Sequence, residues 1–375
     1  LAAAPAHARL TASPSDPAWA YVEARTAAMN GDHARSARLL ERLFEAMPKE
    51  TRFGQKALAA AIESGQFELA LSLARRIPAD KLGTEARLLV AADEIKRRRY
   101  DSAAAWLVEN PDGSDLSFLR PLVAAWAAAE KGDMAGAIQT VSDIPAQGPL
   151  GAYRSEQTAL ILLKFGKTAD AEPFARRAIG ASGIRETRLR LALASGFLAA
   201  GDRRRAAAML DGIAPEVAGA GQRLLDGKAK GQPIATAAEA MSEIVTAVAG
   251  ELVRLQRSAP PLGLVQVARY LNPGNSSAPV LLALLLDLRG REEAALQVLR
   301  SVPADDPLAS QARDSQVRIL TKLKRLDEAL ALANAAARAP GATFADQARL
   351  GETLAAMKRF DEAAAAFQRA IDLAQ

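Results

Sequence analysis

Apolar residues near the end of the chain fall into two helical runs that are separated by a short polar turn. Leu350, Leu354 and Met357 recur at helical spacing before the turn. After it, the same spacing is kept by Ala363, Ala366, Phe367, Ala370 and Ile371. Because apolar residues three and four positions apart share one face of a helix, the pattern predicts two amphipathic helices joined as a hairpin.

This hairpin pattern repeats along nearly the whole chain, at close to 34 residues. When the hairpins are aligned on an early position of the second helix, eight of ten positions are alanine: Ser36, Ala70, Ala103, Ala137, Ala171, Ala206, Pro261, Ala295, Ala329 and Ala363. Twelve residues earlier stand Ala24, Leu58, Ala91, Ala125, Ala159, Ala194, Ala249, Ala283, Val317 and Gly351. Small residues at both positions predict close packing of the two helices.

The position between the paired helices also has a recurring composition. It is glycine at Gly31, Gly65, Gly132, Gly166, Gly201 and Gly290, and a basic residue at Arg98, Lys324 and Lys358. Glycine favours the left-handed conformation that ends a helix, and a cation interacts favourably with a helix C-terminus. We therefore expect each of these residues to end a first helix.

Repeats end in proline at Pro48, Pro149, Pro273 and Pro307, which stops the second helix. A helix-turn-helix repeat of this length, with these small, glycine, alanine and proline positions, resembles the tetratricopeptide repeat (TPR) family over roughly residues 16 to 375. The resemblance implies an all-α, TPR-type α-solenoid of about ten antiparallel helical hairpins in a right-handed superhelix. It also implies a concave groove that binds peptides or partner proteins. The chain departs from the family at the first-helix aromatic position, which holds residues such as Gly54, Arg87, Pro121 and Arg190.

One segment interrupts the 34-residue spacing, because the aligned positions Ala206 and Pro261 are 55 residues apart. The additional residues between them are rich in glycine. We predict an N-terminal array over 16–214, a glycine-rich irregular hinge over 215–233, and a C-terminal array over 234–375 that continues beyond the last residue. Within the break we expect a short helix near 216–228 and a loop, followed by an unusually long first helix from about Ile234 to Gln256. The break, Ser13-Pro14 and the run Arg269-Tyr270-Leu271-Asn272-Pro273 look like long secreted TPR proteins of alphaproteobacteria, some of which are linked to cell-envelope integrity.

Residues 1–8 look like the end of a secretory signal peptide. Ala6 and Ala8 give the small-x-small pattern that a signal peptidase reads, so we expect cleavage after Ala8 and a periplasmic location. An alanine-rich terminus without a signal is the alternative. The chain lacks cysteine, and its formal charge of +5 favours no particular partner.

The sequence predicts no catalytic residue, cofactor or metal site. The only histidines are His7 in the expected leader and His33 in a turn. The segment 221–229 resembles a phosphate-binding loop but has the wrong glycine spacing and no hydroxyl after its lysine. Basic runs at 96–99 and 203–205 fall in turns and lack interleaved aromatics, so nucleic acid is not expected as a partner.

Inward-facing positions of repeats three to six predict a groove that binds proteins or peptides. The candidate residues are Leu88, Leu122, Trp126, Tyr153, Leu160, Lys164, Arg188 and Leu191. Apolar anchors around an aromatic, with polar edges, are typical of peptide-binding grooves. The alternative is that these residues only pack between repeats.

The sequence therefore predicts a non-catalytic, cell-envelope scaffold that binds other proteins through its concave surface. An alternative is the substrate-selecting arm of an envelope enzyme whose catalytic part lies beyond residue 375. A third possibility, a cytosolic assembly factor, depends on whether the leader is real.

Overall fold

The computed structural model describes residues 17–109, 114–255, 261–339 and 342–374. Within these residues the regular structure consists of 21 α-helices and four short 3-10 helices, with one isolated β-bridge between Glu109 and Asp115. This confirms the predicted all-α class. The expected signal peptide and cleavage position lie outside the described residues.

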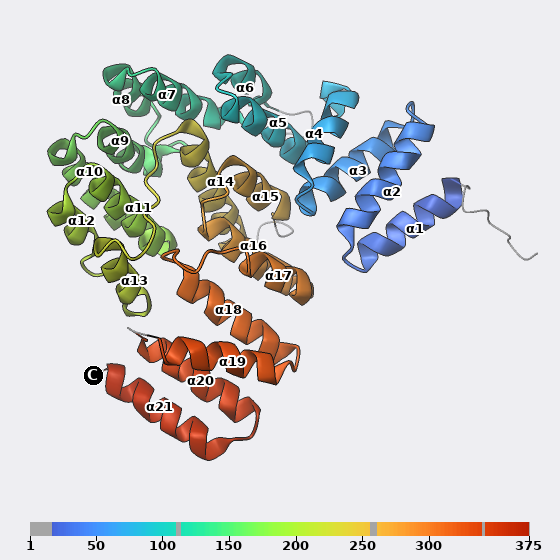
Figure 1. The fold of residues 1–375 in the computed structure, drawn as a ribbon. Helices are drawn as coiled ribbons and strands as arrows, with labels where there is room; N and C mark the ends of the chain where they lie inside the picture. Colours follow the sequence, from blue (N-terminus) through green and yellow to red (C-terminus); the bar gives the residue numbers. More distant parts are fainter. Residues whose placement is uncertain (1–16, 110–113, 256–260, 340–341, 375) are drawn as a thin grey trace, which may run out of the picture. The chain divides into compact units, whose positions relative to one another are not determined.

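The chain forms two compact units, whose helices are shown in Figure 1. The first unit comprises the described residues up to Val90 together with Ser114, and the second comprises the other described residues. The first unit contains α1 (Pro17–Met29), α2 (His33–Ala46), α3 (Thr51–Glu63), α4 (Phe67–Arg76) and η1 (Ala79–Lys81). The division falls within α5 (Thr84–Lys96).

The second unit continues with a series of helical hairpins. Its first part contains α6 (Tyr100–Trp106), η2 (Ser117–Leu119), α7 (Arg120–Glu130), α8 (Met134–Ser142), η3 (Gly151–Tyr153), α9 (Arg154–Lys164), α10 (Thr168–Ala181), η4 (Gly183–Arg185), α11 (Glu186–Ala199), α12 (Arg203–Leu210) and α13 (Pro215–Leu225). Its second part contains α14 (Ala237–Arg254), α15 (Leu262–Leu271), α16 (Ser277–Leu288), α17 (Glu292–Leu299), α18 (Ala309–Lys322), α19 (Leu326–Ala337), α20 (Phe344–Ala356) and α21 (Phe360–Ala374). Apart from α13, the α-helices of the two units pair consecutively into ten hairpins, the number that the repeat predicts.

The aligned positions lie in the packed interior of the hairpins. All ten second-helix positions and all ten first-helix positions are buried. The turn prediction is also confirmed: the six glycines and the cations Arg98, Lys324 and Lys358 all have positive φ, between 58° and 88°. The three cations adopt a conformation that L residues usually avoid, which shows how strongly the hairpin fixes this turn.

The segment that breaks the repeat contains the short helix that the sequence predicts near 216–228, which is α13. Helix α13 fills much of it, and the long first helix predicted to follow is α14. The segment lies wholly inside the second unit, and its role as a hinge between two arrays stays a prediction.

Helix α14 also packs against α7, far earlier in the sequence. The Glu130 carboxylate accepts the Ala237 backbone N–H at 2.7 Å, at the start of α14. Near the end of α15, the Tyr270 hydroxyl donates to Asp93 at 2.8 Å. The chain therefore folds back within the second unit and places α14 beside α7 and the end of α15 beside Asp93 of α5.

Candidate functional site

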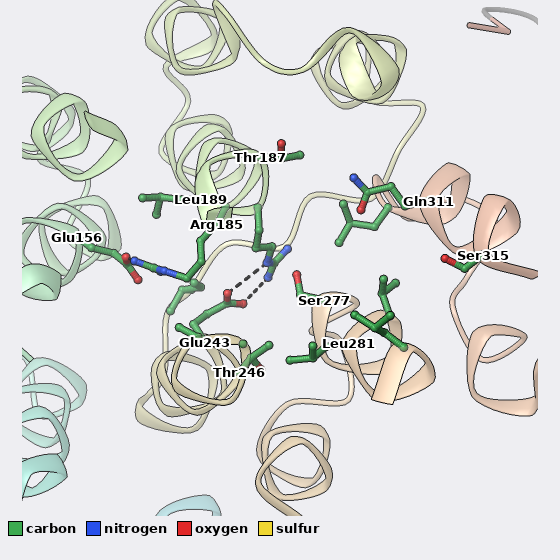
Figure 2. A pocket seen from close by; sticks show the side chains of 18 of the residues that line it. Glu156, Arg185, Thr187, Leu189, Glu243, Thr246, Ser277, Leu281, Gln311 and Ser315 are labelled. Atoms are coloured by element: carbon green, nitrogen blue, oxygen red, sulfur yellow. Dashed lines mark hydrogen bonds and ion pairs between the residues drawn. The ribbon is translucent and has the colours of Figure 1, made fainter. Parts of the chain in front are cut away.

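The second unit contains a cavity of about 440 Å³ that is lined mainly by α11, α14, α16 and α18 (Figure 2). These are the first helices of four successive hairpins. Three equivalent positions of each repeat, eighteen, fourteen and eleven residues before the aligned second-helix position, supply most of the lining. The eighteenth position gives Arg188, Glu243, Ser277 and Gln311. The fourteenth gives Ala192, Ala247, Leu281 and Ser315, and the eleventh gives Gly250, Leu284 and Arg318.

Helical geometry explains why these positions open onto one space. Residues four and seven positions apart lie on the same face of a helix. On α16 that face carries Ser277, Leu281 and Leu284, and the corresponding face of α18 carries Gln311, Ser315 and Arg318. The cavity is therefore the shared inner face of consecutive repeats.

Two ion pairs form one wall of the cavity. The Arg188 Nε donates to Glu243 Oε2 at 3.2 Å, and the two side chains are only 13% and 9% exposed. Arg185 Nη1 donates to Glu156 Oε2 at 2.9 Å. Figure 2 shows Glu156 and Arg185 facing each other on one side of the cavity.

The electrostatics of this wall follow from its burial. Burial raises the pKa of the Glu156 carboxyl, and the charge of Arg185 only partly opposes that shift. Burial lowers the pKa of the Arg185 guanidinium, but Glu156 and Tyr153 together raise it above the ordinary arginine value. The Arg185 guanidinium also lies 4.6 Å from the centre of the Tyr153 ring. The pairing lets charged groups line the cavity without leaving a bare buried charge.

Further hydrogen bonds hold this wall against the segment between α13 and α14. Arg188 Nη1 donates to Gln232 Oε1 at 3.0 Å, and the Gln232 amide in turn donates to Ser276 and Asp306. The other carboxylate oxygen of Asp306 accepts the Leu308 backbone N–H at 2.7 Å. Glu243 and Gln232 thereby hold the Arg188 guanidinium from two sides.

Thr246 of the lining donates to the Ser242 carbonyl, but five other polar side chains of the lining are left without a partner in the described part of the chain. Among the described residues, no hydrogen-bond partner is found for the side chains of Thr187, Ser277, Gln311, Ser315 and Arg318. The Ser277 Oγ is itself buried, so its unmet hydrogen-bonding capacity has an energetic cost. Figure 2 shows this hydroxyl directed toward the open space, with Gln311 and Ser315 beyond it. The cavity offers hydrogen bonds and apolar surface to a ligand.

Most residues of the predicted groove are buried in helix packing. Leu88, Leu122, Trp126, Leu160 and Leu191 are at most 2% exposed, and Tyr153 is 9% exposed. Lys164 is partly exposed, and Arg188 alone among the eight lines the cavity.

The surroundings of Trp126 show what this burial means for binding. Its indole N–H donates to Gln157 Oε1 at 2.8 Å, and α14 packs against the helix that carries it. A partner would reach the buried side chains only if the helices separated. Their role in partner binding stays a prediction.

The basic runs are held largely by carboxylates. In the first run, Arg97 pairs with Asp93, Arg98 with Glu130 and Arg99 with Glu94. In the second run, Arg203 pairs with Asp226, and Arg205 pairs with both Asp202 and Glu172. Lys96 lies 4.2 Å from the centre of the Tyr270 ring. Pairing within the fold reduces the positive charge that these runs present to an anionic partner.

The described helices and acidic side chains also bear on two other kinds of site. Within the described ranges, no three His, Cys, Asp or Glu side chains are grouped so that they could hold a metal ion. Nor does any helix in those ranges combine the length and the apolar character that a membrane span needs.

No protein-family model and no curated protein sequence matches the chain. Among solved structures, yeast Tom70 aligns over 96% of this chain and 85% of its own, with 13% identity and a TM-score of 0.30. A structure of Naa15/Naa10 bound to HypK-THB aligns over 94% and 66%, with 14% identity and a TM-score of 0.36. A tetratricopeptide repeat protein from Parabacteroides merdae aligns over 69% and 93%, with 13% identity and a TM-score of 0.29. At these values no function follows from the likenesses, and the hairpin architecture rests on the helices described above.

Proposed function

We propose that the chain is a non-catalytic scaffold of the TPR family, which binds a segment of a partner protein in the cavity of its second unit. The family assignment is supported by the 34-residue hairpins and by the nine turn residues with positive φ. The observation that carries the binding site is the set of equivalent inner positions on successive first helices, at which Ser277, Gln311, Ser315 and Arg318 have no side-chain partner among the described residues.

The proposed location is the cell envelope. It depends on the pattern Ala6-His7-Ala8, which favours secretion and cleavage after Ala8. N-terminal sequencing of the native protein tests it. A mature protein that starts at Arg9 in the periplasmic fraction is expected, and an uncleaved protein in the cytosol would contradict it.

The binding site is tested by a pair of substitutions on α16. Leu284 lines the cavity and is 38% exposed, whereas Leu288 lies one turn further along, is 64% exposed and is outside the lining. Leu284→Glu places a charge among apolar contacts, so it should abolish partner binding. Leu288→Glu is the matched control, since it adds the same charge to the same helix.

The measurement is quantitative cross-linking in cells that express each variant at equal level. Partners that depend on the cavity should be lost from Leu284→Glu and kept by wild type and Leu288→Glu, with all three proteins melting within a few degrees of each other. If Leu284→Glu keeps the same cross-linked partners as wild type, the cavity is not the partner site.

A further inference from the structure

Among the residues that the structure describes, not all of the charged side chains around the cavity have a partner of opposite charge. Five charged side chains line it, and four of them form the pairs Glu156–Arg185 and Arg188–Glu243. The fifth, Arg318 on α18, is exposed and has no carboxylate partner among the described residues. A guanidinium at the edge of a binding cavity recognises a carboxylate well, because its donors match the two carboxylate oxygens.

Next to Arg318, the preceding repeat presents apolar surface at the equivalent position. Leu284 and Arg318 are 34 residues apart and occupy the same position of successive first helices, α16 and α18, which pack against each other. Leu281 adds to the apolar surface one turn earlier on α16. The cavity therefore places an apolar contact and a cation in adjacent repeats.

Repeat geometry sets the distance between these two contacts. Packed helices lie about 8 to 10 Å apart, so equivalent positions on α16 and α18 are separated by about that distance. An extended peptide advances about 3.3 Å per residue. The two contacts are therefore about three residues apart along a bound strand.

We infer that the cavity recognises an extended peptide segment in which an aspartate or glutamate lies about three residues from an aliphatic side chain. The aliphatic side chain contacts Leu281 and Leu284, and the carboxylate pairs with Arg318. This inference rests on the proposed function and adds the chemistry of the partner segment.

The unpartnered polar side chains support a peptide over a purely apolar ligand. Gln311 can both donate and accept a hydrogen bond, as the N–H and C=O groups of an extended backbone require. Ser277 and Ser315 can do the same from the neighbouring positions. A peptide backbone would supply the partner that the buried Ser277 hydroxyl lacks in the folded chain.

The test is selection of random octapeptides on the purified full chain, followed by fluorescence titration of the enriched sequences. Wild type should enrich peptides with an acidic residue about three positions from Leu, Ile, Val or Met. Arg318→Gln should keep the aliphatic preference, lose the acidic one and bind a selected peptide about 3- to 10-fold more weakly. Arg338→Gln, at an arginine that is exposed and outside the lining, is the matched control and should leave binding unchanged.

Salt and the Leu284→Glu variant separate the remaining outcomes. Added salt should weaken peptide binding to wild type more than to Arg318→Gln, because it screens the exposed charge pair. If peptides bind wild type and not Leu284→Glu but show no acidic preference, the inference on ligand chemistry is wrong while the proposed site stands. If no peptide is enriched on wild type over Leu284→Glu, the proposed function fails with it.

Discussion

Arg188 and Glu243 illustrate a contact that sequence patterns cannot reveal. The inner positions of Arg188 and Glu243 both follow from the repeat, but the repeat does not show that the two side chains pair across the 55 residues that separate them. Both side chains are nearly buried, so each depends on the other to offset the loss of water. The pair should therefore matter for stability whether or not the cavity binds a partner.

Substituting one member of this pair should destabilise the protein more than substituting both. Glu243→Leu or Arg188→Met alone leaves a buried charge unpaired, and we expect a loss of about 3 to 5 kcal/mol in the free energy of unfolding. The double variant should lose clearly less. Urea unfolding measures the cycle, and Glu251→Gln, in the exposed pair with Arg254 on the same helix, should change stability by about 0.5 kcal/mol or less. Additive losses from the two single changes would contradict the coupling.

The residues of the candidate site were only partly predictable. Counting back from the aligned alanines selected inner positions in repeats three to six, where Trp126 and Leu160 stand eleven residues before Ala137 and Ala171. The same count in later repeats gives Leu284 and Arg318, which are not among the predicted groove residues. Periodicity identifies inner positions, but it does not show which of them the chain covers by packing α14 against α7.

Between helices, packing compensates for the departures from the family pattern. The first-helix aromatic is absent at Gly54, and the buried ring of Phe44, from the preceding helix α2, lies against that position instead. Arg87 and Arg190 stand at two other such positions. Arg87 donates to the backbone carbonyls of Ala79 and Leu82, and Arg190 donates to that of Met209. Contacts with neighbouring elements thus replace the contacts of the first-helix aromatic that these repeats lack.

Gly54→Ala should therefore destabilise the hairpin array. A Cβ at position 54 would lie 2.9 to 3.0 Å from carbon atoms of the Phe44 ring, which is only 2% exposed and cannot move freely. We expect a loss of about 1 to 3 kcal/mol, as for overpacking in other cores. Gly180→Ala, on α10 with nothing within 4 Å of the added atom, should instead gain up to about 1 kcal/mol. Urea unfolding of both variants decides this, and a loss of the same size in both would argue against the role of Phe44.

Helix α12 begins with a cap whose strength should depend on pH. Asp202 accepts the Arg205 backbone N–H at 2.9 Å, and this bond, with the Arg205 side chain, lowers the pKa of Asp202 to about 2. Because the folded value is below the ordinary value of about 3.9, the stabilisation is present above that pH and is lost as pH falls toward 2. Asp202→Asn keeps an acceptor without the charge. The melting temperature of wild type should exceed that of Asp202→Asn at pH 6 by more than at pH 3, and an equal difference at both would contradict the prediction.

Across the second unit, the contacts that organise the chain are distant in sequence. Glu130 and Ala237 are 107 residues apart, Gln232 and Asp306 are 74 apart, and Lys96 and Tyr270 are 174 apart. Local periodicity predicts each hairpin, yet it carries no information on such pairs. The segment between the arrays is one example, because its glycine and proline residues indicate a hinge, while Gln232 and Lys230 within it donate hydrogen bonds to Asp306 and Asp305.

The anchored segment gives the clearest test of the architecture. The Lys230 N–H donates to the Asp305 carbonyl at 3.1 Å, and the Ala235 and Thr236 N–H groups donate to the Glu239 carboxylate at 2.8 and 2.9 Å. Hydrogen exchange at these amides should be slowed, unlike exchange in an open linker.

Gln232→Ala removes the side chain that joins Arg188, Ser276 and Asp306, and leaves buried polar groups of its neighbours unsatisfied. We expect a loss of about 1 to 3 kcal/mol in stability and faster exchange over 229–236 and at the Leu308 amide. Gln222→Ala, which removes an exposed contact with Asp226 on α13, is the control and should leave those amides protected. If wild type already exchanges over 229–236 as fast as a free peptide, the segment is the hinge that its composition indicates, and the two arrays on either side of it can move independently.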